Sequence, residues 1–166
     1  MNPLIQAIKN NNPHQLKLLL DVGHDPNKEV ADEEFLRLKI DPLSIAPSNN
    51  IGYAEVLLKA GVNLKTIINP VIFVPPLMHA AHSNLPVTAQ LLIEHGADLN
   101  YCNDLNITSL IEASKNSAME VAKLLLENGA DTHVVEWEGY TALEHAKQRR
   151  NTELILEIGK YPNTQK

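Results

Sequence analysis

Histidine and cysteine are the side chains of this sequence best suited to binding a metal ion or acting in catalysis. His79 and His82 share one face of a helix, because residues at positions i and i+3 are neighbours on its surface. His79, Glu112 and His145 recur at equal intervals along the sequence. Zinc requires its ligands at about 2.0–2.1 Å from one point, whereas stacked helical units stand about 10 Å apart. The sequence therefore predicts no metal site along this row.

A catalytic site is not indicated either. Cys102 is the only cysteine of the chain, and no histidine lies close to it in the repeating register. No nucleophile motif of the G-x-S-x-G type occurs in the sequence. We therefore expect no catalytic residues, no metal and no cofactor, and an enzyme is the function class that the sequence supports least.

The equal spacing of the histidine row belongs to a repeat that runs through the chain. A Leu-x-x-Ala pattern occurs in five copies; the first interval between its leucines is the longest and the last two are equal. In the first four copies a glycine follows that leucine at a nearly constant distance. The positions are Leu4, Leu43, Leu77, Leu110 and Leu143, with Gly23, Gly61, Gly96 and Gly129. Such regular spacing predicts one structural unit copied several times.

The stretch from Pro76 to Asn100 shows what the unit is. Two short apolar segments flank a turn, and residues such as Ala89 and Leu92 have helical spacing. Gly96 stands where a helix commonly ends in a left-handed residue. A lone pair of short helices cannot bury its apolar stripe, so the copies must stack on one another.

The repeat resembles the ankyrin repeat, a unit of about 33 residues with T-P-L-H-x-A near its start. The resemblance covers nearly the whole chain, from Asn2 to about Tyr161. It implies an all-α fold, an ankyrin-repeat solenoid of stacked helix-turn-helix units with hairpin fingers between them. We expect a single domain over residues 1–166. Its five repeats are predicted at approximately 1–27, 37–65, 70–100, 103–133 and 136–162, the first and last being caps.

The helix starts carry local signals. Thr108 and Thr141 stand at capping positions. In ankyrin repeats this threonine also bonds to a histidine further along the same helix, at a position occupied here by Ile111 and Glu144. We expect that bond to be absent and each repeat to be somewhat less rigid for it. Pro47 is expected to shorten or kink the first helix of the second repeat.

Composition restricts the partners. The chain has a net charge of -6, which disfavours nucleic acid because phosphate binding needs clustered Lys and Arg, and which suits a basic protein. No segment is long and apolar enough to span a bilayer, so no membrane is expected as a partner. A single cysteine cannot form an intrachain disulfide, which favours a reducing compartment. We expect a cytoplasmic monomer, delivered to a host cell if the chain is a bacterial effector.

Two connections between repeats are unusual. Residues 66–75 are apolar and uncharged, so Phe73 is either an exposed anchor or buried by a finger that folds back on its neighbours. Trp137, the only tryptophan, is expected at the tip of the last finger, with Tyr140 nearer its base. Trp137 either anchors a partner, as Trp does in many interfaces, or packs on the adjacent finger.

The ends of the first helices form a polar row that either adds specificity or is ordinary solvated surface. We predict a non-catalytic protein–protein interaction module of the adaptor or bacterial or viral effector type. The alternative is a dedicated inhibitor or immunity protein that blocks an enzyme or toxin. The predicted partner-binding residues are Phe73, His82, Asp104, Leu105, Lys115, Trp137, Tyr140 and Arg149.

Overall fold

The computed structural model describes residues 3–10, 12–25, 56, 59–61 and 75–161. The chain divides into two compact units, Met1–Pro76 and Leu77–Lys166, which are treated separately below. Phe73, most of the apolar connection before Pro76 and most of the second predicted repeat, with Pro47, lie outside the described residues. The predictions made for them stay predictions, as do the single domain and the count of five repeats.

Every described helix is short. In the first unit, α1 spans Pro3–Lys9 and α2 spans Pro13–Asp21. From Pro76 onward the helices are α7 (Pro76–His82), α8 (Pro86–Glu94), α9 (Ser109–Asn116), α10 (Met119–Glu127), α11 (Ala142–Gln148) and α12 (Thr152–Gly159). Helices shorter than about 12 residues are marginal in water on their own, so packing between them must supply the stability.

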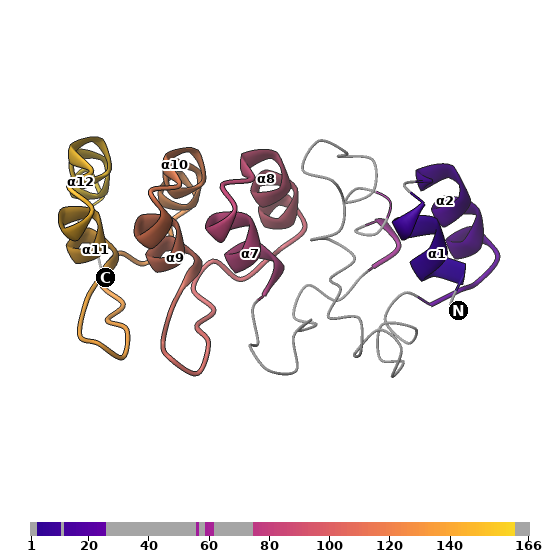
Figure 1. Cartoon of the computed structure of the whole chain (residues 1–166), viewed down its shortest axis with the longest axis horizontal. Helices are drawn as coiled ribbons and strands as arrows, with labels where there is room; N and C mark the ends of the chain where they lie inside the picture. Colours follow the sequence, from indigo (N-terminus) through magenta and orange to yellow (C-terminus); the bar gives the residue numbers. More distant parts are fainter. Residues whose placement is uncertain (1–2, 11, 26–55, 57–58, 62–74, 162–166) are drawn as a thin grey trace. The chain divides into compact units, whose positions relative to one another are not determined.

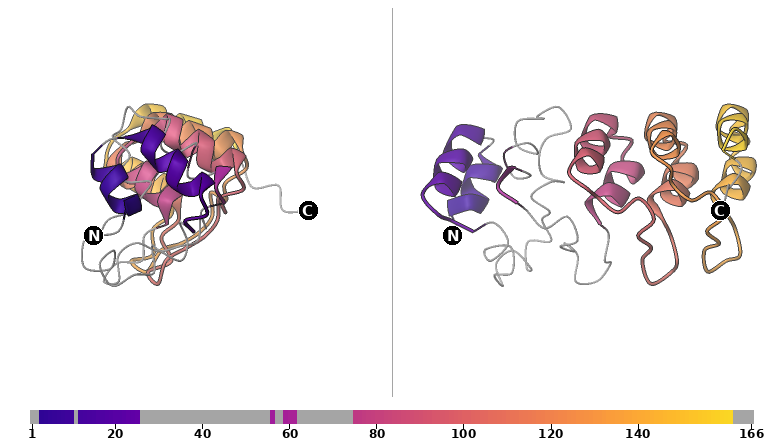
Figure 2. Two further views of the ribbon diagram at one scale, coloured as in Figure 1. Left: turned by 90° about the vertical axis from the view of Figure 1, so that its right-hand side faces the viewer. Right: turned by 180° about the vertical axis from the view of Figure 1, so that it is seen from behind.

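The second unit arranges its helices in two rows. The first helices, α7, α9 and α11, lie side by side in one row, and α8, α10 and α12 form the other (Figures 1 and 2). Helix α9 packs against α11, and α10 packs against both α8 and α12. Among the residues that the structure describes there is no strand. The fold is the all-α stack of helical hairpins that the sequence predicts.

Small and aliphatic side chains fill the space between successive hairpins. Leu77 and Leu110, which occupy the same position of successive copies, are both buried. Leu143, the equivalent residue in the last copy, is half-buried. The fully buried residues of the second helices are Ala89, Leu92, Val121, Ala122, Leu125, Leu126 and Leu154. The repeating register of the sequence thus places equivalent residues into one continuous apolar core.

Left-handed residues close the second helices and the turns inside the hairpins. Gly96 and Gly129 follow α8 and α10 with φ of 82° and 88°, as the sequence predicts. The turns between the paired helices also hold a left-handed residue, and here the chain has no glycine: Asn84, Ser117 and Arg150 have φ of 49°, 55° and 56°. A Cβ makes this conformation costly for residues other than glycine and, to a lesser degree, asparagine.

The threonine caps form as predicted, with one correction. The Thr108 side chain accepts a hydrogen bond from the Ile111 N–H at 3.3 Å, and Thr141 likewise caps α11. No threonine–histidine bond can form here, because Ile111 and Glu144 stand at the histidine position. The correction concerns the last described repeat, where Glu144 supplies a replacement: the Thr141 hydroxyl donates to its carboxylate at 2.9 Å. The Thr141 N–H also donates to Glu144 at 2.6 Å, completing a capping box.

Substituting glycine for Arg150 should stabilise the fold. The change removes a side chain from a left-handed position where it stores strain, and we expect a gain of about 1 kcal/mol in the free energy of unfolding. Asn84→Gly, at the equivalent turn, is the matched control. It should bring no gain, because asparagine tolerates this conformation and its side chain also bonds to Glu120. Urea denaturation followed by circular dichroism measures the free energy of unfolding of both variants. Equal gains in the two variants would contradict backbone strain at Arg150.

The capping box should make stability depend on acidity. Hydrogen bonds from the Thr141 backbone N–H, and then from its hydroxyl, lower the pKa of Glu144. A lowered pKa in the folded state means that the carboxylate stabilises the fold above its unfolded-state pKa, roughly 4.3, and loses that contribution as the pH falls through the folded value. Glu144→Gln should therefore be less stable than the native chain at pH 7, and the difference should disappear on acidification. A difference that stays constant between pH 7 and pH 3 would contradict this role.

Candidate functional site

Two hairpin fingers project from the second unit, on the same side of the helices (Figures 1 and 2). They connect α8 to α9 and α10 to α11, and we call them the first finger, residues 97–108, and the second finger, residues 130–141. Each leads directly into the cap of a first helix, Thr108 in one and Thr141 in the other. The stacked helices therefore fix the base of each finger.

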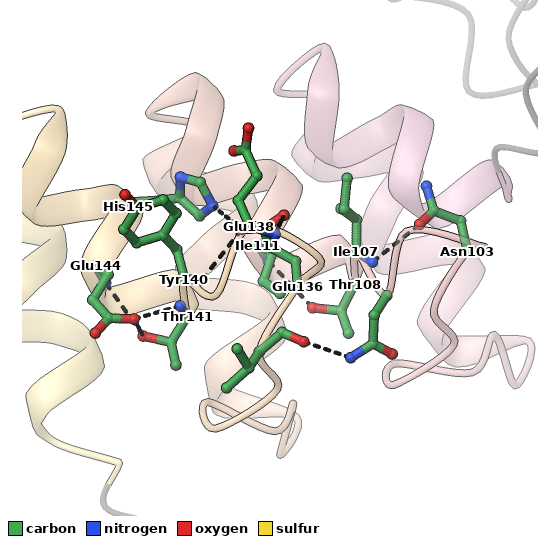
Figure 3. A network of polar contacts seen from close by, with 12 residues as sticks. Asn103, Ile107, Thr108, Ile111, Glu136, Glu138, Tyr140, Thr141, Glu144 and His145 are labelled. Atoms are coloured by element: carbon green, nitrogen blue, oxygen red, sulfur yellow. Dashed lines mark hydrogen bonds and ion pairs between the residues drawn. The ribbon is translucent and has the colours of Figure 1, made fainter.

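One side chain closes the tip of each finger. In the first finger, Asn103 Oδ1 accepts hydrogen bonds from the backbone N–H groups of Leu105 and Ile107, both at 3.0 Å. In the second, the Glu136 carboxylate accepts the N–H groups of Glu138 at 3.1 Å and Tyr140 at 3.3 Å. The two acceptors occupy equivalent positions of successive repeats, and each closes the tip of its own finger. Figure 3 shows the bond from Ile107 to Asn103 and the residues that surround Glu136.

Hydrogen bonds also join the two fingers to each other. Asn106 Nδ2 donates to the Val135 carbonyl at 2.6 Å, and the Trp137 N–H donates to the Leu105 carbonyl at 3.0 Å. Further toward the helices, the Asp131 N–H donates to Asn100 Oδ1 at 2.8 Å. Because backbone groups at the tips take part, the two fingers present a single fixed surface.

Large apolar side chains lie exposed on this surface. Trp137 is 64% exposed, Leu105 and Val135 are 47% exposed, and Tyr140 is 39% exposed. We call these four residues the finger ridge. Of the two alternatives for Trp137, this exposure favours the open anchor over packing on the adjacent finger. The Tyr140 ring meets the His145 ring edge to face, with centroids 5.6 Å apart, and so lies closer to the helices, as expected.

The most buried polar contact of the site was not anticipated. The Glu136 side chain is fully buried, and its Oε1 lies 3.7 Å from Nε2 of His145, a buried atom without a hydrogen-bond partner among the described residues. Figure 3 shows the His145 ring between Tyr140 and the finger backbone. In the sequence, His145 stands out only as a candidate metal ligand. The match between Asn103-x-x-Asn106 and Glu136-x-x-Gly139, in which the fourth residue is left-handed in both fingers, could have indicated that Glu136 closes its finger. It does not indicate the contact with His145.

The predicted polar row lies apart from the ridge. His82 is exposed, and its Nδ1 lies 2.7 Å from Glu112 Oε1. Lys115 is half-buried and Arg149 is exposed. Lys115 and Arg149 stand at or just beyond the C-terminal ends of α9 and α11, whose N-termini meet the fingers, so about 12 Å of helix separates them from the ridge. His82 stands at the C-terminal end of α7. Asp104 is exposed at the tip of the first finger, beside Leu105.

Other charged contacts link neighbouring repeats. Asn84 Nδ2 donates to Glu120 Oε2 at 2.7 Å, and this bond is the main cause that lowers the pKa of Glu120. Lys123 Nζ lies 2.9 Å from Glu153 Oε1. Asn84 lies in the turn before α8, and the other three residues lie on α10 and α12, so these contacts link successive hairpins away from the ridge.

The described residues hold no group of three or more His, Cys, Asp or Glu side chains that could bind a metal ion. His79 is half-buried, and burial lowers its pKa, with a further contribution from His82. Cys102 is exposed on the first finger. No described helix is long and apolar enough to cross a membrane.

Stacked helical hairpins with projecting fingers define a class, the helical-repeat proteins that present one continuous surface. The family comparison is specific: the model of ankyrin repeats in three copies matches residues 56–135 and 77–166. These matches cover more than half of the chain, which therefore belongs to the ankyrin-repeat family. A search of curated proteins found no match.

Removing the buried carboxylate should loosen the second finger. Glu136→Ala leaves the N–H groups of Glu138 and Tyr140 without their acceptor, and we expect a loss of about 1–3 kcal/mol in stability. Glu138→Ala, an exposed change in the same finger, is the matched control and should stay within about 0.5 kcal/mol. Amide exchange measured by NMR should show faster exchange at Glu138 and Tyr140 in the Glu136 variant. Unchanged exchange at both amides would contradict the role of Glu136.

Proposed function

We propose that this chain is a non-catalytic interaction module that binds a partner protein through the finger ridge and the adjoining ends of the first helices. Ankyrin repeats are generally protein–protein interaction modules, and the chain belongs to that family. An adaptor or effector that recruits another protein is the function that this architecture supports best. The proposal rests on the residues of the fingers, since the family alone does not choose a partner.

The observation that carries the proposal is the exposure of Trp137 beside Leu105 on a fixed backbone. Trp is among the residues that contribute most to binding at protein interfaces. Its backbone N–H is tied to the carbonyl of Leu105, so little chain entropy is lost when a partner docks. An exposed apolar cluster on rigid support is a typical interaction surface.

The remaining predicted residues serve as polar contacts. His82, Lys115 and Arg149 occupy successive repeats at the far ends of the first helices. Their charges and hydrogen-bonding groups would set the register of a partner that extends from the ridge across the stack. Phe73 stays in the proposal as a sequence-based contact.

The same surface suits a dedicated inhibitor or immunity protein, and the acidic residues beside the ridge favour that function if the target is a basic enzyme. Loss of the recovered partner's activity on mixing would identify an inhibitor, and unchanged activity an adaptor. The exposed thiol of Cys102 and the lack of a second cysteine in the sequence favour the cytoplasm as the site of action.

Comparative affinity capture tests the proposal. The chain and its Trp137→Ala variant, each immobilised, should recover the same partner in very different amounts, because losing a hot-spot Trp costs about 2 kcal/mol, or roughly 30-fold in Kd. Leu156→Ala is the matched control: Leu156 is 66% exposed, like Trp137, but lies on α12. It should leave the affinity unchanged.

Quantitative mass spectrometry and titration calorimetry supply the readouts. A partner bound equally by the native chain and the Trp137 variant, or lost with the Leu156 variant alone, would contradict binding through the finger ridge.

A further inference from the structure

Both fingers carry negatively charged side chains and lack lysine and arginine. Residues 97–108 contain Asp98 and Asp104, and residues 130–141 contain Asp131, Glu136 and Glu138. In contrast, four basic residues lie at the opposite ends of α9 and α11: Lys115, Lys147, Arg149 and Arg150. The negative charge is therefore concentrated where the exposed apolar side chains are.

Two of these carboxylates adjoin the ridge and have no ionic partner among the described residues. Asp104 directly precedes Leu105, and Glu138 directly follows Trp137, and both are exposed. Neither forms an ion pair with a residue that the structure describes. Asp98 and Asp131 instead accept backbone N–H groups of their own fingers, at 3.0 Å and 2.8 Å. Asp104 and Glu138 are thus the carboxylates open to a partner.

We infer that the finger ridge takes an extended segment of a partner protein in which two cationic side chains, arginine above all, flank an apolar residue. This inference rests on the proposed function and adds the chemistry of the partner. A guanidinium can pair with a carboxylate in a bidentate manner and stack on an aromatic face, which an ammonium does less well. Trp137 supplies such a face next to Glu138, and Leu105 and Val135 supply the apolar contact.

The geometry also sets the spacing of the cations. Asp104 and Glu138 belong to adjacent fingers, and stacked helices stand about 8–10 Å apart. An extended chain in the polyproline II conformation has three residues per turn and advances about 3.1 Å per residue, so its residues i and i+3 lie on one face. A β-strand would point them to opposite faces. Cations that reach both carboxylates are therefore separated by two intervening residues, which gives a cation-x-x-cation pattern with the apolar residue between them.

Other occupants fit the charge less well. Nucleic acid and anionic lipid surfaces are repelled by unpaired carboxylates. A second copy of the chain would bring its own acidic ridge, unless it docked through the basic ends of its first helices. Analytical ultracentrifugation of the chain alone tests for self-association. Dimers that form in the native chain and are lost in the Trp137→Ala variant would overturn the inference.

The test is selection from a random peptide library displayed on phage, with the full chain as the target. The only tryptophan of the chain is Trp137, so its fluorescence reports binding of tryptophan-free peptides at the ridge. We expect the selected peptides to contain Arg or Lys in the cation-x-x-cation pattern around an apolar residue. Enrichment of neutral or acidic peptides, or no enrichment, would overturn the inference.

Charge-removing variants then test the contacts. Asp104→Asn and Glu138→Gln should each weaken the selected peptides about threefold, and the double variant about tenfold. Glu127→Gln removes an exposed carboxylate on α10, outside the fingers, and should have no effect. The effect of the finger variants should shrink in high salt, because exposed charge pairs are screened.

The variants separate this inference from the proposed function. If Trp137→Ala abolishes peptide binding while Asp104→Asn and Glu138→Gln leave it unchanged, the ridge binds protein but the cationic chemistry is wrong. If Trp137→Ala also leaves it unchanged, the ridge is not the binding surface and the proposed function fails as well.

Discussion

Burial of one apolar seam between successive helical hairpins is the interaction on which the rest of this structure depends. Helices as short as α7 and α8 do not persist alone, and each hairpin exposes an apolar stripe until a neighbour covers it. Leu110 and Leu125 are fully buried because α9 and α10 pack against each other and against neighbouring hairpins. The stack then holds the base of each described finger at a defined position.

The stack fixes the base of each finger but not its tip. Side chains that form hydrogen bonds within and between the fingers fix the tips. Asn103 and Glu136 close their own fingers, and Asn106 ties one finger to the next. As a result, Trp137 and Leu105 are exposed without being loosely held. A rigid, exposed apolar surface loses little entropy on binding, which links the stability of the stack to recognition.

The register of the stack could be read from the sequence because it depends on spacing. Leu77 and Leu110 recur with the repeat, and the threonine caps depend on neighbours within the first turn of the helix. The bond between Thr141 and Glu144 was also within reach, because Thr-x-x-Glu is a capping-box pattern. The contact of the buried Glu136 with His145 was not, because it depends on how α11 packs beside the finger, which local patterns do not encode.

The candidate site was therefore predictable in its exposed part and not in its support. Trp137, Tyr140 and Leu105 could be named from residue type and repeat position, and the structure places them together on joined fingers. Lys115 and Arg149 could also be named, but only the structure shows that a helix length separates them from the ridge. The role inferred for Asp104 and Glu138 also depends on the structure, because only the structure shows that neither carboxylate forms an ion pair with a described residue.

Hydrogen–deuterium exchange of the full chain, free and bound to its captured partner, tests the central claim most directly. Binding through the finger ridge predicts new protection at residues 103–107 and 135–140, with little change along α8, α10 and α12. Protection confined to those outer helices, with the fingers exchanging as in the free chain, would contradict the account.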